Sequence, residues 1–180
     1  MLRTVLTIIF ITILTGCATV KPEVYGQMPP GKYWVEIPTN DPSITAWGSK
    51  GTHKDETYAV IIRELPLAPS ESIEVFTENV KATHKDIMGS HDFVMTDELR
   101  LMPDSENWCM EYESVSICKD AKRYSHRTDP MMLHEIGRYC RHPKNNDILL
   151  LIYYSRRFYR GDEAPGFSRE AQNFLDGVAF

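Results

Sequence analysis

The residues best suited to bind a metal lie on or next to one predicted strand, at residues 131–141. His134, Cys140 and, just beyond, His142 share one parity, so their side chains would point to the same face of that strand. With Cys118 they would offer the nitrogen and sulfur ligands that Zn²⁺ takes. However, no Cys-x-x-Cys or paired histidine spacing supports tetrahedral binding, and a disulfide at Cys140 would remove one ligand. We therefore expect neither a metal nor a cofactor, and interpret the segment as a disulfide-linked strand end with His142 in the following turn.

Hairpin geometry ranks the pairings of the three cysteines in the second half of the chain. If 106–118 and 131–141 are antiparallel neighbours, opposed residue numbers have a constant sum, and pairing Cys118 with the first residue of the second segment gives 249. Cys109 and Cys140 also sum to 249, at the close spacing that a cross-strand disulfide can use. The other two pairings need a register that leaves much of the second strand unpaired, or a tight turn at unsuitable residues. We expect Cys109–Cys140, with the other pairings and free thiols as alternatives.

Three arginines, Arg156, Arg157 and Arg160, stand among aromatic residues near the end of a predicted strand at 147–159. Guanidinium groups suit bidentate contact with phosphate or carboxylate, so this segment could bind an anionic lipid headgroup, a glycan or a partner protein of the cell envelope. The interpretation we favour is a half-exposed strand whose arginines pair with the acidic strands at 92–113.

Known catalytic motifs are missing from the sequence. It has no Gly-x-Ser-x-Gly elbow, no glycine-rich phosphate loop, no dinucleotide fingerprint and no His-Glu-x-x-His, since His134-Glu135 is followed by Ile-Gly-Arg. We therefore expect a protein that is not an enzyme. The alternative is a hydrolase without a known motif, which would bring His134 or His142 close to a Ser, Asp or Glu. No run of Lys and Arg with interleaved aromatics predicts a nucleic-acid partner.

The first residues differ in kind from the rest of the chain. A short positive start ending at Arg3 is followed by a run from Val5 to Leu14 that is apolar except for two threonines. This run is far shorter than the roughly 20 apolar residues of a transmembrane helix. Its length and its flanks are typical of a secretory signal peptide.

The signal ends in Leu14-Thr15-Gly16-Cys17, which resembles the lipobox of bacterial lipoproteins. The resemblance is limited to the first twenty or so residues. It implies that residues 1–16 are removed, that Cys17 is diacylated on sulfur and acylated on its new amino group, and that the chain is anchored to a membrane of the cell envelope. Ala18 in place of Asp resembles Gram-negative lipoproteins carried on to the outer membrane, facing the periplasm. The alternative is an ordinary secretory signal with a fortuitous cysteine.

Removing 16 of 180 residues leaves 164, enough for one domain with a sizeable core. Residues 17–31 contain three prolines and two glycines and predict a flexible tether, so the domain should occupy residues 32–180. Charge is unevenly divided, with a net of −9 over residues 17–118, +6 over 119–160 and −3 beyond. Export also places the cysteines in an oxidising compartment, where a disulfide is expected.

Alternating and β-branched residues predict strands at 33–37 and 57–65, separated by a loop that could hold a short strand at 44–47. A helix should begin with Ser70 as its N-cap and end at Gly89, because apolar residues between them step by three and four. Strand-like segments then follow at 92–101, 106–118, 131–141 and 147–159.

The run from Ile148 to Tyr153 is apolar at consecutive positions, which predicts a central strand covered on both faces. Ser168 should open a final helix that covers the sheet. The sequence thus predicts an α+β domain with an antiparallel sheet of about five to seven strands and two main helices. This order of elements is similar to that of PsbP-like domains, a likeness of fold that implies no function. We expect a membrane-anchored envelope lipoprotein acting as a binding or structural module.

Overall fold

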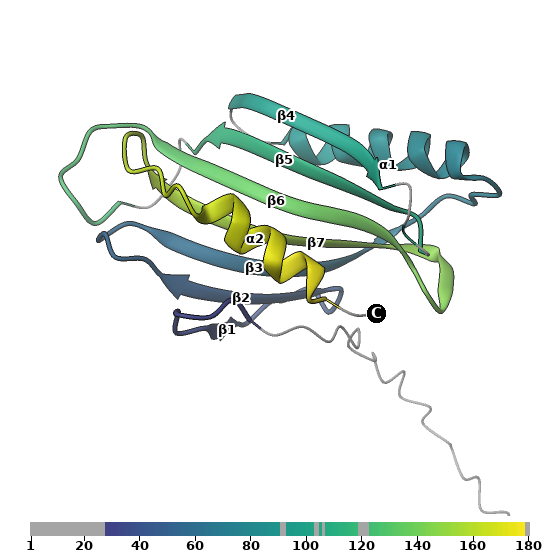
Figure 1. The fold of residues 1–180 in the computed structure, drawn as a ribbon, viewed down its shortest axis with the longest axis horizontal. Helices are drawn as coiled ribbons and strands as arrows, with labels where there is room; N and C mark the ends of the chain where they lie inside the picture. The colour runs from purple at the N-terminus through teal and green to yellow at the C-terminus, as the bar shows by residue number, and fades with distance from the viewer. Residues whose placement is uncertain (1–27, 91–92, 103–104, 106, 119–122, 179–180) are drawn as a thin grey trace, which may run out of the picture.

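Seven strands form one antiparallel sheet in the computed structural model, which describes residues 28–90, 93–102, 105, 107–118 and 123–178 (Figure 1). The predicted α+β class, with a helix after the third strand and another at the C-terminus, is confirmed. The elements in chain order are β1 (Val35–Ile37), β2 (Ile44–Lys50), β3 (Thr57–Pro66), α1 (Ile73–Met88), β4 (Phe93–Met102), β5 (Cys109–Ile117), β6 (Met131–His142), β7 (Asn145–Tyr159) and α2 (Phe167–Asp176).

The strands lie in the order β1-β2-β3-β7-β6-β5-β4. Consecutive strands pair as hairpins on either side of the sheet, while β3 and β7, far apart in the chain, pair over ten positions and join the two halves. The predicted central strand is confirmed, because β7 is the middle strand and Leu149 to Ile152 are all 2% exposed or less. Both faces of β7 must therefore be covered.

The two helices cover opposite faces of the sheet. Figure 1 shows α2 lying across β6, β7 and β3 on the side of the viewer. Its apolar residues Phe167, Ala171, Phe174 and Leu175 pack on a core that includes Val60, Ile136, Ile152 and Tyr154. Helix α1 packs on the other face, over residues that alternate with these along the strands, namely Leu65, Met110, Tyr112, Tyr139, Leu149 and Leu151.

The helix starts differ slightly from the prediction. Ser72, not Ser70, is the N-cap of α1, and its hydroxyl accepts a hydrogen bond from the backbone N–H of Val75. Ser70 instead donates to the carbonyl of Ala68, so its hydroxyl is already engaged before the helix begins. Helix α2 begins at Phe167, one residue before the predicted start, after Gly166, which has no side chain to cap it.

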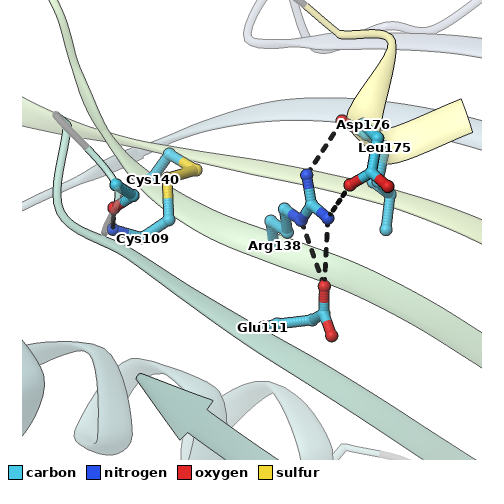
Figure 2. The surroundings of a disulfide bond; sticks show 7 residues. Cys109, Glu111, Arg138, Cys140, Leu175 and Asp176 are labelled. Carbon is cyan, nitrogen blue, oxygen red and sulfur yellow. Dashed lines mark hydrogen bonds and ion pairs between the residues drawn. A yellow bond between two sulfur atoms is a disulfide. The ribbon is translucent and has the colours of Figure 1, made fainter. Parts of the chain in front are cut away.

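The register of β5 and β6 is the one predicted from the cysteines. Cys109 faces Cys140, their Cα atoms are 4.2 Å apart, and a disulfide joins them, while Cys118 is free (Figure 2). The hairpin between β6 and β7 turns at residues 143–144, where His142 Nδ1 accepts the backbone N–H of Lys144. His142 thus lies beside a turn, as expected.

The proposed lipid attachment site, Cys17, and most of the predicted tether lie outside the described residues. Of the helices within the described part of the chain, none combines the length and apolar character needed to cross a membrane.

Candidate binding groove

A row of small residues crosses the sheet face that carries α1. Gly48 on β2 lies opposite Ala59 on β3, and Ala59 lies opposite Ser155 on β7. The main contacts of α1 are farther along this face and toward β4. The side chain of Ile37 lies over Gly48, with its Cδ1 atom 2.9 Å from where a Cβ would be. Ala59 and Ser155 rise little above the backbone and α1 does not extend over them, so the face is hollow there.

The hollow is a groove of about 950 Å³. Its lining is mostly apolar, and its volume is within the range of roughly 300–1,000 Å³ that is typical of small-molecule sites. Its floor is the row of small residues together with Thr57, Leu133 and Arg157, and the free Cys118 lies at one end. The apolar residues at its β1 rim are unusually exposed, with Tyr33 at 85%, Val35 at 52% and Ile37 at 44%. Apolar side chains left open to water around a concavity are typical of a binding surface.

The charges at the groove are all positive. Its lining contains Lys32, Lys50 and Arg157 but no Asp or Glu among the described residues. The ammonium of Lys32 is turned away, because it pairs with Glu170 of α2 and lies 4.2 Å from the centre of the Tyr58 ring. Lys50 and Arg157 therefore supply the cationic charge of the groove.

Arg157 shares one feature with Arg63 and Arg141. Its Nε is buried and has no hydrogen-bond acceptor within the part of the chain that the structure describes. A desolvated donor without an acceptor is unfavourable by about 1–3 kcal/mol, and more when the group is charged.

A buried carboxyl group lies next to the groove floor. Glu135 of β6 is directly opposite Ser155 and is only 5% exposed. Burial disfavours its ionised form and raises its pKa to about 7. The carboxyl group is therefore about half ionised at physiological pH.

The three arginines predicted as one patch are separated by the fold. Arg156 is 4% exposed on the face that carries α2, and its Nε donates to Glu56 at 2.6 Å. Arg157 points to the other face and lines the groove, because successive side chains of a strand alternate. Arg160 is exposed beyond the end of β7. Pairing with the acidic strands at 92–113 is wrong for Arg156, whose partner comes from the loop before β3.

The Arg156–Glu56 ion pair is closely packed in the core at the end of the sheet. Burial alone would raise the pKa of Glu56, but the hydrogen bond from Arg156, with others from His53 and Tyr58, brings it down to about 2. Arg156 also donates to the carbonyl of Asp162 at 2.7 Å. With its donors used in this way, Arg156 stabilises the loop before β3 and is not available to an outside anion.

His134 does not form a catalytic relay. Its Nε2 lies 2.7 Å from Glu113 Oε1, and the hydroxyl of Ser168 donates to the same oxygen at 3.4 Å. In a Ser-His-acid triad the imidazole lies between the hydroxyl and the carboxylate, so that it can take the hydroxyl proton. Here the carboxylate lies in the middle, and the contact ties β5 and β6 to the start of α2.

A second ion pair holds the other end of α2 (Figure 2). Arg138 on β6 donates to Glu111 Oε2 at 3.1 and 3.2 Å, to the carbonyl of Leu175 at 3.0 Å and to Asp176 at 2.5 Å. Gln172 donates to the same oxygen of Glu111 at 3.0 Å. Burial would raise the pKa of Glu111, but its hydrogen bonds keep that pKa below its usual value. These contacts are structural, because they fix α2 on the sheet.

Two polar clusters that sequence reasoning missed also connect distant segments. The carboxylate of Asp55 accepts the backbone N–H groups of Tyr124 and Ser125 and the hydroxyls of Ser125 and Tyr159, which keeps its pKa well below the usual range. The second cluster lies under α1. There the buried His84 bridges β4 and β6, since its ring nitrogens lie 2.8 Å from Asp97 and 3.1 Å from the hydroxyl of Tyr139.

No group of three His, Cys, Asp or Glu side chains in the described residues is arranged to hold a metal ion. His134, Cys140 and His142 are not brought together, because Cys140 is in the disulfide, His134 is paired with Glu113 and His142 is at the turn. No protein-family model and no curated protein matches the chain.

Proposed function

We propose that this protein is a lipid-anchored binding module of the bacterial cell envelope, without enzymatic activity, and that the groove beside β1 is its binding site. The observation that carries the proposal is the groove itself, an exposed apolar concavity of about 950 Å³ with the side chain of Arg157 in its floor. His134 and Arg156, which the sequence suggested for chemistry or anion binding, are paired with Glu113 and Glu56 in contacts that connect strands and loops.

The lipobox-like sequence supports the anchoring part of the proposal. Gly31, at the groove rim, follows Cys17 by 14 residues, which span about 43 Å when extended at about 3.1 Å per residue. An acylated Cys17 would hold the groove within this distance of the membrane surface. Ala18 favours the outer membrane, with the domain in the periplasm.

Replacing the lipidated residue tests the anchor. In cells expressing the full chain, Cys17→Ser should move the protein from the membrane fraction to the soluble fraction, because acyl chains can no longer be added. The matched control is Cys118→Ser, which should stay in the membrane fraction. A Cys17→Ser protein that remains membrane-bound, or a wild-type chain that retains residues 1–16 in the cytosol, would contradict the proposal.

Site-specific photocrosslinking tests the groove. A photoreactive diazirine amino acid replacing Val35, at the rim, should give adducts in intact cells, whereas the same amino acid replacing Val75 should not. The two valines are similarly exposed, at 52% and 44%, but Val75 lies on α1 away from the groove. Equal labelling at both positions, or no adduct at either, would show that the groove is not the binding site.

A further inference from the structure

The groove has a charge opposite to that of the whole chain. The chain has 25 acidic and 20 basic residues, yet the groove lining contains three basic residues and no acidic one among those described. An uneven distribution of this kind attracts an anionic partner. The partner must also have an apolar part, because most of the lining is apolar.

The two available cations lie in one row across the sheet. Lys50 is opposite Thr57, and Thr57 is opposite Arg157, so two strand spacings of about 4.8 Å separate the two basic residues along the row. Arg157 is the more specific of the two, because it lines the groove and its planar guanidinium can hold one carboxylate through two parallel charge-assisted hydrogen bonds. Lys50 is exposed at the edge and adds attraction without fixed geometry.

The apolar part of the groove extends from this row toward β1. From Arg157 on β7, the lining continues through Ala59 on β3 to Val35 and Ile37 on β1. Three strand spacings, about 14 Å, separate β7 from β1. Strand β6, which contributes Leu133 to the lining, lies one spacing farther from β1 than β7 does. A long narrow apolar chain fits such a surface, and small anions would leave Val35 and Ile37 exposed.

We propose that the groove binds a single-chain anionic amphiphile of the fatty-acid class. Its carboxylate lies at Arg157, with Lys50 nearby, and its acyl chain runs along the small-residue floor to the exposed rim at β1. This inference rests on the proposed function, in which the groove is the binding site. The short connection to Cys17 supports it, because it keeps the groove near a membrane surface that holds such molecules.

The test measures the affinity of a fluorescent anthroyloxy-labelled palmitate for the full chain carrying Cys17→Ser, and for variants made in that background. Arg157→Gln removes the charge in the floor, and Ala59→Leu fills the groove without changing charge. Arg160→Gln is the matched control, because Arg160 lies outside the groove and is exposed. Thermal melts followed by circular dichroism confirm that each variant is folded.

We expect Arg157→Gln and Ala59→Leu each to weaken binding about tenfold or more, as the loss of a charge-assisted hydrogen bond or of the cavity implies. Arg160→Gln should leave the affinity within about twofold. Unlabelled palmitate should displace the probe, cetyl alcohol of the same length should do so at least about tenfold less well, and acetate should not.

Two results would overturn the inference. One is the absence of saturable palmitate binding, and the other is binding that neither Arg157→Gln nor Ala59→Leu weakens. If palmitate does not bind but the photoreactive residue at position 35 still captures a partner in cells, the fatty-acid inference fails and the proposed function stands. If palmitate does not bind and position 35 captures no partner, the fatty-acid inference and the proposed function both fail.

Discussion

At the scale of single residues, Glu135 links the stability of the domain to pH. Its pKa is raised to about 7 by burial, from the 4.5 of an unburied side chain. Between these two values the folded chain holds a proton that the unfolded chain has lost. The contribution of protonated Glu135 to the free energy of unfolding is therefore fully present below about pH 4.5. It is lost as the pH rises toward and past 7.

The variant Glu135→Gln should thus gain stability relative to wild type as the pH rises. Between pH 4.5 and pH 8, the free energy of unfolding of the variant relative to that of wild type should rise by up to about 3 kcal/mol, at 1.36 kcal/mol per pKa unit. Urea unfolding of both proteins at the two pH values measures it. A difference that is the same at both pH values would contradict the raised pKa.

Glu56→Gln is the control of opposite sign. The pKa of Glu56 is lowered to about 2, so its stabilising pair with Arg156 is present above about pH 4.5 and is lost as the pH falls toward 2. Glu56→Gln should therefore be less stable than wild type at pH 8, and the deficit should shrink on acidification.

The arginines show where residue-level prediction stops. Arg156 and Arg157 are neighbours in the sequence, but strand alternation sends one into an ion pair beneath α2 and the other into the groove. The sequence indicates this alternation, yet it does not indicate which face a helix covers. The partner of Arg156, Glu56, is 100 positions away and could not be identified from spacing.

At the scale of elements, the hairpin formed by β5 and β6 was predictable because its register is local. The numbering of Cys109 and Cys140 already specified which residues oppose one another, and the structure has the same register throughout β5. In contrast, the pairing of β3 with β7 depends on segments about 90 residues apart. The groove floor forms only when that pairing brings Ser155 next to Ala59 and Gly48. The sequence therefore contained no signal for the groove.

The disulfide should contribute measurably to the stability of this hairpin. Replacing both partners by Cys109→Ser and Cys140→Ser should lower the free energy of unfolding by about 2–4 kcal/mol, as expected for a closed loop of this size. Urea unfolding measures the loss, and a reducing agent should produce a similar loss in the wild type. Cys118→Ser is the matched control, because Cys118 is not in a disulfide. A double variant as stable as wild type would contradict a stabilising role.

At the scale of the whole molecule, the uneven charge of the sequence is only partly neutralised by neighbouring strands. Glu111 and Glu113 of the acidic half pair with Arg138 and His134 of the basic half across the boundary of β5 and β6. Arg157, from the same basic segment, is left facing the groove. Part of the charge division along the chain thus holds the sheet and α2 together, and Arg157 contributes to a binding surface.

The account depends most on the groove being occupied when the protein is in the cell envelope. The direct measurement is photocrosslinking from position 35 in intact cells, compared between the otherwise wild-type chain and one that also carries Ala59→Leu. We predict an adduct in the first that is lost or strongly reduced in the second, because the larger side chain fills the floor next to the rim. Undiminished crosslinking with Ala59→Leu, in a protein that is folded and membrane-bound, would contradict the central claim.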